Sequence, residues 1–149
     1  MQIVKATGQS RDEMINLLQS NNLPTEDLPS SLDEFYAAID EGRVVGLIGM
    51  ERYTHYGLLR SMVVHPTYRN RHIAEKLVQL LEQTAHASGI TAMYLLTETA
   101  PQYFERKGYQ KIAREEVPEA LQASSEFSHV CPVSAIVMKK MISQEWKKY

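Results

Sequence analysis

One stretch of the sequence, residues 58–81, constrains the fold more than any other. It begins with a nearly continuous apolar run at residues 58–64, which is typical of an inner β-strand covered on both faces. Pro66 ends that strand, because proline cannot donate a hydrogen bond to a sheet. Apolar residues then recur at helical spacing from Ile73 to Ala85, which indicates an amphipathic helix. The stretch therefore predicts a strand, a short turn and a helix in immediate succession.

Three basic residues, Arg69, Arg71 and His72, lie in the turn before this helix. The first turn of a helix carries N–H groups without intrahelical acceptors and a partial positive charge, so it favours anions. A diphosphate needs several converging N–H donors together with nearby positive charge. The turn is therefore a candidate site for a phosphorylated cofactor, and a solvated pair of arginines is the alternative interpretation.

The other segments mix strands and helices without strict alternation, which is typical of a mixed α/β or α+β domain. Glu41-Gly42 lies between two apolar runs and predicts a hairpin turn. Strands are expected at residues 2–7, 35–39, 43–53, 58–64, 92–96, 109–114 and 134–140. Helices are expected behind a capping box formed by Ser10 and Glu13, from residue 73 to a stop at 88–89, at 99–107 and at 118–124.

Composition limits the partners and the compartment. The chain has 149 residues, for which one domain over 1–149 is expected, and its net charge of −2 gives no basic field for nucleic acid. No apolar run approaches the roughly 20 residues of a membrane span, and the first residues do not resemble a signal peptide. A cytoplasmic location follows. The single cysteine, Cys131, excludes an internal disulfide and a cysteine-rich zinc site, and no metal is expected.

Residues 68–74 read Tyr-Arg-Asn-Arg-His-Ile-Ala. This segment resembles the acetyl-CoA loop of the GNAT superfamily of N-acetyltransferases, whose pattern is Gln/Arg-x-x-Gly-x-Gly/Ala. Arg69 and Ala74 match that pattern, whereas His72 stands where the family usually has glycine. The strand before the loop, the strand at 92–96 and the segment 103–109 also fall at the family's spacing. The ordered set covers nearly the whole chain.

The resemblance implies a single GNAT-type domain: a central twisted mixed sheet of about six to seven strands, flanked by helices. Strands 58–64 and 92–96 are then expected to separate into a V-shaped split that receives acetyl-CoA. The main chain of residues 62–64 would pair with the pantetheine arm, and the loop amides would hold the pyrophosphate. The implied cofactor-binding residues are Met62, Val63, Val64, Arg69, Asn70, Arg71, His72, Ile73, Ala74, Glu75 and Thr97.

The implied reaction is direct attack of a primary amine on the thioester. A main-chain N–H near Met62 or Val63 would stabilise the oxyanion. Phe104 stands in place of the family's acidic tyrosine, so Tyr103 is the candidate acid, with helix packing as its alternative role.

The sequence offers several further polar candidates. Glu51, Glu98 and His55 are candidate bases, and each residue type is also common on surfaces. Arg60 lies on an otherwise apolar strand and needs a partner if it is buried. That partner is either a substrate carboxylate or a structural ion pair.

The C-terminal part of the chain narrows the resemblance. Segments at 95–100, 117–121, 126–127 and 131–135 look like a bacterial subgroup labelled as arsenic-resistance N-acetyltransferases, related to N-acetylglutamate synthase domains. The implied acceptor is a small-molecule amine, with an amino acid or an analogue as the leading class. Two rival functions stay open: a non-catalytic acetyl-CoA-binding module, and protein N-terminal acetylation. The sequence leaves a homodimer open.

Overall fold

The computed structural model describes residues 1–23, 25–26, 28–124 and 135–142. Cys131 and the segments at 126–127 and 131–134 lie outside this description. The strands are β1 (Gln2–Lys5), β2 (Phe35–Asp40), β3 (Arg43–Tyr53), β4 (Tyr56–Val64), β5 (Ala92–Thr97), β6 (Gln110–Ile112) and β7 (Ile136–Met141). The helices are α1 (Arg11–Ser20), α2 (Ile73–Ala87), α3 (Pro101–Arg106) and α4 (Glu119–Gln122), with 3-10 turns at Gly8–Ser10, Pro66–Tyr68 and Arg114–Glu116.

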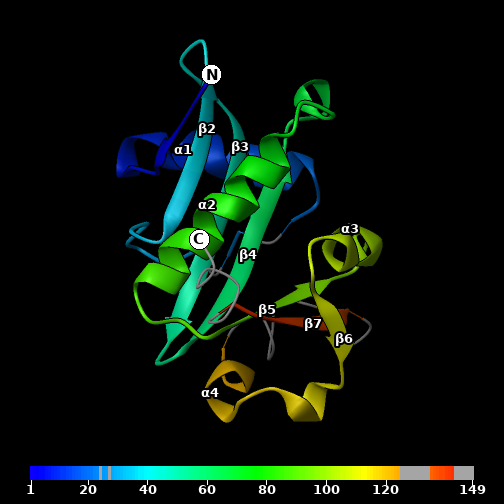
Figure 1. Cartoon of the computed structure of the whole chain (residues 1–149). Coiled ribbons are helices and arrows are strands. Elements are labelled where there is room, and N and C mark those ends of the chain that lie inside the picture. The colour runs from blue at the N-terminus through cyan, green and yellow to red at the C-terminus, as the bar shows by residue number, and fades with distance from the viewer. Residues whose placement is uncertain (24, 27, 125–134, 143–149) are drawn as a thin grey trace. The chain divides into compact units, whose positions relative to one another are not determined.

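The strands form one seven-stranded sheet in the order β1-β2-β3-β4-β5-β7-β6, whose elements are labelled in Figure 1. β4 and β5 are parallel, whereas β1 with β2, β2 with β3, and β7 with both β5 and β6 are antiparallel. The expected mixed sheet flanked by helices is therefore confirmed. The parallel register joins Tyr56–Leu58 of β4 to Ala92–Tyr94 of β5, and both strands continue beyond it. The expected V-shaped split beyond this register stays a prediction.

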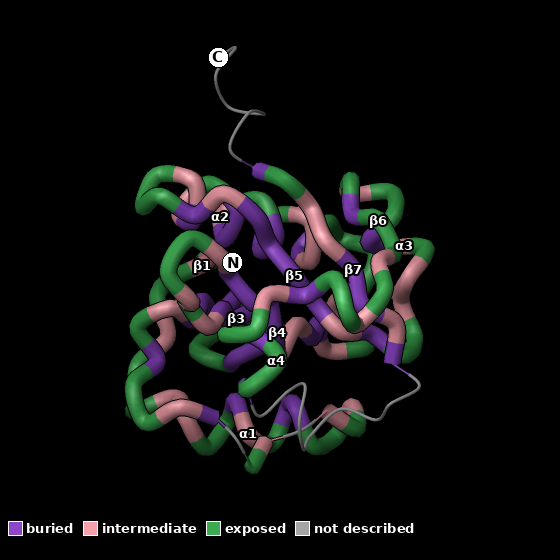
Figure 2. Tube along the Cα trace, turned by 90° about the horizontal axis from the view of Figure 1, so that it is seen from below, coloured by how far each residue is buried: buried purple, intermediate pink, exposed green. Residues whose placement is uncertain are grey.

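The described residues group into two compact units, and the expectation of one domain over 1–149 stays a prediction. The first unit contains residues 1–51 and 59–84. Its core forms where one face of α1 packs on the strands, and the buried α1 residues of that face are Met14, Leu17 and Leu18. β3 is buried without interruption from Val44 to Met50, and Figure 2 colours the buried parts of the chain purple. Most of β4 is also buried, which confirms the predicted inner strand.

The hairpin between β2 and β3 turns at the predicted dipeptide. Asp40 pairs with Arg43, and the two residues between them, Glu41 and Gly42, have φ angles of 51° and 77°. Two consecutive positive φ angles are typical of the type I′ turn, whose twist matches that of the flanking strands. This turn brings Asp40 to the end of the hairpin.

The predicted capping box is wrong. Ser10 precedes α1 but makes no side-chain capping hydrogen bond, because it closes a 3-10 turn with φ −90° and ψ 0° instead of the extended conformation of most caps. Glu13 is also engaged elsewhere, since its Oε2 accepts the N–H of Val44 at 3.2 Å. The first turn of α1 is thus tied to β3.

The second unit contains residues 52–58 and the described part of 85–149. β5 and β7 pair over six residues each, and α4 contributes Leu121 to the core beneath them. α3 ends before Gly108, whose φ of 96° is the left-handed conformation that commonly ends helices. The helix predicted at 99–107 and the strand predicted at 109–114 both exist but are shorter.

Candidate functional site

β4 contains a residue with unusual backbone geometry. Ser61 has a φ of 59°, in the left-handed region that non-glycine residues seldom occupy. Such a residue rotates the peptide groups that follow it relative to the regular ladder, as in a β-bulge. Met62 and Val63, the predicted pantetheine and oxyanion contacts, follow at once. Backbone strain of this kind is concentrated at functional sites.

The turn between β4 and α2 has the same character. Asn70 and His72 have φ angles of 65° and 61°, so His72 adopts the conformation for which the family's glycine is suited. The carbonyl oxygen of His72 accepts the N–H of Lys76 at 3.1 Å. Residues 73–75 therefore supply the first N–H groups of α2, which come before the first hydrogen bond of the helix. Turns of this geometry gather N–H groups into concavities that bind anions.

The three basic residues of this turn make different contacts. Arg69 donates from Nε to the carbonyl oxygen of Val64 at 3.3 Å and from Nη2 to Oδ1 of Asn21 at 3.0 Å. The guanidinium carbon of Arg71 lies 4.9 Å from the ring centroid of Tyr68. Nδ1 of His72 lies 3.3 Å from Oε2 of Glu75. Arg69 thus fastens the end of β4 to the end of α1, and all three basic residues are exposed.

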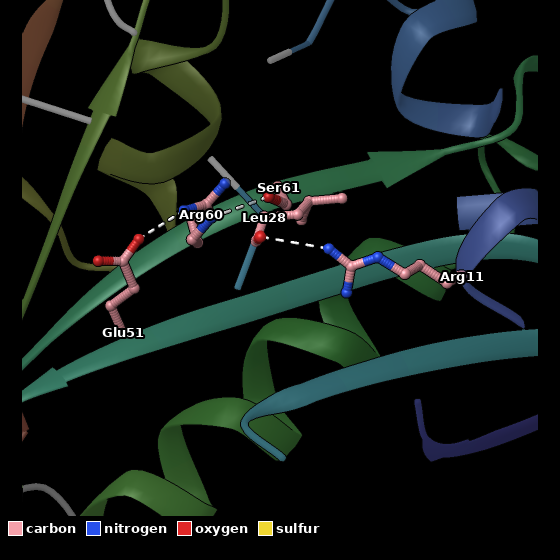
Figure 3. A network of polar contacts seen from close by, with 5 residues as sticks. All are labelled: Arg11, Leu28, Glu51, Arg60 and Ser61. Carbon is pink, nitrogen blue, oxygen red and sulfur yellow. Dashed lines mark hydrogen bonds and ion pairs between the residues drawn. The ribbon is translucent and has the colours of Figure 1, made fainter. Parts of the chain in front are cut away.

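Arg60 and Glu51 form an ion pair, shown in Figure 3. Nη1 of Arg60 lies 2.5 Å from Oε2 of Glu51, and the side chains are 1% and 22% exposed. Nε of Arg60 donates to Oγ of Ser61 at 3.1 Å, and the guanidinium carbon lies 6.0 Å from the ring centroid of Phe35. Of the two partners considered for Arg60, the structure contains the ion pair. It also brings together two residues that the sequence analysis treated separately.

Arg11 was not among the predicted residues. It donates to the carbonyl oxygens of Pro29 and Leu28 at 2.7 and 3.2 Å, and so holds the segment between α1 and β2 (Figure 3). A cation in the first turn of a helix opposes the helix dipole. The unfavourable position of Arg11 in the first turn of α1 was the sequence signal that its side chain has a partner elsewhere in the fold.

The remaining candidates belong to the second unit. Thr97 is buried, and its Oγ1 accepts the N–H of Ala100 at 3.1 Å just before α3. Glu98 is exposed. The Tyr103 hydroxyl oxygen is buried, and its ring has two neighbouring cations, Arg106 at 6.0 Å and Lys107 at 5.5 Å from the centroid.

Phe104 has a packing role in this unit. It is buried and makes edge-to-face contacts with the rings of Tyr103 and Tyr109. His55 is exposed beside Tyr56. Within the part of the chain that the structure describes, no group of three His, Cys, Asp or Glu side chains could hold a metal ion.

Changing Thr97 to valine should destabilise the start of α3. The change keeps the shape of the side chain but removes the oxygen that accepts the Ala100 N–H. The free energy of unfolding is expected to fall by about 1 kcal/mol, the usual net value of such a bond. Urea denaturation measures this, and Thr97→Ser, which keeps the oxygen, is the matched control. An unchanged stability of Thr97→Val would contradict the capping role.

With the geometry established, sequence comparison identifies the family. The family model described as "Acetyltransferase (GNAT) domain" matches residues 31–111. The chain belongs to the GNAT acetyltransferase family. This agrees with the resemblance in the acetyl-CoA loop and with the mixed seven-stranded sheet.

Individual relatives agree with this membership. An uncharacterized N-acetyltransferase of Chlorobaculum tepidum is 28% identical over 97 residues, which are 64% of this chain and 62% of that protein. An amino-acid acetyltransferase of Edwardsiella ictaluri is 30% identical over 67 residues, 45% of this chain and 15% of that protein. The matched stretch thus spans less than two thirds of either relative.

Among solved structures, the N-acetylglutamate synthase of Neisseria gonorrhoeae, in a complex with coenzyme A and N-acetyl-glutamate, superposes with a TM-score of 0.83. It is 15% identical, and the match covers 95% of this chain and 35% of that one. At that identity the likeness establishes the fold. Among the described residues, no helix has the length and apolar character needed to cross a membrane.

Proposed function

We propose that this GNAT protein transfers an acetyl group from acetyl-CoA to the primary amine of a small molecule, with an amino acid or an analogue as the acceptor class. The observation that supports this most is the backbone of the first unit. Ser61 adopts a left-handed conformation within β4, and the turn with left-handed Asn70 and His72 leads into the first amides of α2. Both features suit a ligand that is held by main-chain groups.

The cofactor would bind along this backbone. The main chain of Met62, Val63 and Val64 would pair with the pantetheine arm, and the amides of residues 70–75 would hold the diphosphate. Arg71 would add positive charge from the exposed side of the turn. Arg69 would act mainly by fixing the turn, because its guanidinium donates to Val64 and Asn21. Thr97 would contribute by ordering the segment that begins α3.

In the proposed chemistry, the neutral amine attacks the thioester carbon, a C–N bond forms, and the C–S bond breaks. A main-chain N–H of Met62 or Val63 would donate to the oxyanion. The Tyr103 hydroxyl would return a proton to the leaving thiolate. Glu98 is the preferred group to accept a proton from the attacking amine, because the other proposed carboxylate, Glu51, forms an ion pair with Arg60.

Arg60 and the resemblances to known proteins bear on the acceptor class. A substrate carboxylate at Arg60 would have to share or displace the carboxylate of Glu51. The relatives named above include an amino-acid acetyltransferase, and the structure likened to this chain holds N-acetyl-glutamate. These resemblances favour amines that also carry an acidic group.

A thiol-release screen tests the proposal. Acetyl-CoA is incubated with amino acids, their phosphonate and arsenical analogues, and polyamines, and the acetylated product is identified by mass spectrometry. We expect turnover with at least one amino acid or analogue. Binding of acetyl-CoA without thiol release from any amine would instead support the non-catalytic module that Phe104, in place of tyrosine, also suits.

Tyr103→Phe should lower kcat by up to about a hundredfold, the low end of what a positioned acid contributes. The KM for acetyl-CoA should change little, because the variant removes a hydroxyl and keeps the ring. Steady-state kinetics at saturating acceptor measures the effect. Tyr56→Phe is the matched control, since that ring packs on Tyr94 in the same unit. An unchanged kcat would exclude Tyr103 as the acid.

A further inference from the structure

Tyr68 connects the basic turn to the β2–β3 hairpin. Its hydroxyl donates a hydrogen bond to Oδ2 of Asp40 at 2.8 Å. Asp40 is the last residue of β2, where the type I′ turn holds it. Its other oxygen, Oδ1, lies 3.8 Å from the amino group of Met1. The hydroxyl end of the Tyr68 ring is thus anchored to the end of the β2–β3 hairpin.

The face of the same ring carries Arg71. The guanidinium carbon lies 4.9 Å from the ring centroid, within the range of a cation–π contact. The ring of His65 meets Tyr68 edge-on, with centroids 5.9 Å apart. Arg71 is exposed and has a long, flexible side chain, so this contact restricts where its charge is presented.

We propose that Tyr68 is a positioning residue for the cofactor diphosphate: anchored by Asp40, its ring holds the Arg71 guanidinium beside the amides of residues 70–75. This inference rests on the proposed function. It assigns the two arginines different tasks. Arg69 is committed to Val64 and Asn21, whereas Arg71 is held on a ring and faces solvent.

The hydroxyl of Tyr68 is protonated at neutral pH. The pKa of Tyr68 is raised above its ordinary value, chiefly because its hydroxyl donates to Asp40 and further because of burial and the charge of that carboxylate. Glu41 adds to this increase and Arg43 opposes it. The Tyr68 hydroxyl therefore keeps the proton that it donates to Asp40 at neutral pH, where coenzyme A binding is measured.

Isothermal titration of coenzyme A and of pantetheine tests the inference. Pantetheine lacks the diphosphate together with the adenosine and its 3′-phosphate, so dephospho-coenzyme A, which keeps the diphosphate, is titrated as well. A loss that coenzyme A and dephospho-coenzyme A share and pantetheine does not show excludes the 3′-phosphate as its cause and reports on the diphosphate end of the cofactor. We expect Arg71→Ala to weaken coenzyme A binding about fivefold to tenfold and Tyr68→Leu about threefold, as an exposed contact of this kind allows. The double variant should bind no more weakly than Arg71→Ala alone, because Tyr68 acts through Arg71.

Asp40 supplies a matched pair of variants. Asp40→Asn keeps an oxygen that accepts from the Tyr68 hydroxyl and should retain most of the affinity, whereas Asp40→Ala should behave like Tyr68→Leu. Tyr68→Phe keeps the ring and loses only the anchor. These variants also serve if Tyr68→Leu does not fold, which thermal melting reveals.

The outcomes separate the two proposals. Wild-type protein that does not bind coenzyme A would overturn both the proposed function and this inference. Wild-type binding that is unaltered in Tyr68→Leu, Tyr68→Phe and Asp40→Ala would overturn the inference alone. Equal losses for coenzyme A and pantetheine would also overturn it, because they would indicate a purely structural role for Tyr68.

Discussion

Changing Glu51 to alanine is expected to lower the free energy of unfolding by about 3–5 kcal/mol, the usual cost of removing one partner from a buried ion pair. The Arg60 side chain is only 1% exposed and its Nη1 lies 2.5 Å from the Glu51 carboxylate. In the Glu51→Ala variant, the Arg60 guanidinium would stay buried without the Glu51 carboxylate. Water can enter from the side of Glu51, which is 22% exposed, and this places the expected value at the lower end.

Urea denaturation measures the change, and Glu98→Ala is the control because it removes an exposed carboxylate. The double variant Arg60→Met, Glu51→Leu should recover most of the lost free energy of unfolding, since apolar residues often replace a buried pair at little cost. A loss below about 0.5 kcal/mol in Glu51→Ala, the range of ordinary surface changes, would contradict this account.

The second large effect is expected at Gly49. This residue lies directly opposite Phe35 in the β2–β3 register, and the Phe35 ring covers it. A Cβ at position 49 would lie 2.3 Å from Cε2 and 2.5 Å from Cδ2 of that ring. The ring is itself buried and cannot simply move aside. Gly49→Ala should therefore cost about 3 kcal/mol, the upper part of the range for overpacking a core.

Thermal and urea unfolding both report this change. Gly8→Ala is the control, because no atom outside the adjoining chain lies within 4 Å of the position that a Cβ would occupy there. Combining Gly49→Ala with Phe35→Leu should cost less than the sum of the two single changes, since the smaller side chain leaves room for the methyl group. Strict additivity would mean that the ring and the new methyl group do not compete for space.

The parts of the fold that follow from local chemistry could be predicted from the sequence. The apolar run of β4, the Glu41-Gly42 turn and the start of α2 depend on neighbours a few residues away. The predicted capping box was wrong because it was also inferred only from residues close together in the sequence. Glu13 instead bonds to Val44, 31 residues further along the chain, and no local pattern contains that contact.

The candidate site divides in the same way. The loop motif and the spacing of the other motifs indicated the family that the family model then showed, and His72 adopts the left-handed conformation for which glycine is usual. Ser61 gave no signal, because serine has no special preference for positive φ. The pairings of Arg60 with Glu51, Tyr68 with Asp40 and Arg69 with Asn21 depend on strand register and chain topology, which one sequence does not fix.

The left-handed serine in β4 also bears on how such a protein changes over evolutionary time. A cofactor that is bound through main-chain groups does not require particular side chains at those residues. Under the proposed function, the side chains of Val63 and Val64 would be constrained by packing in the core, where both are buried, and not by the cofactor. Selection for a different acceptor would then act on other positions and leave the proposed main-chain contacts of this strand in place.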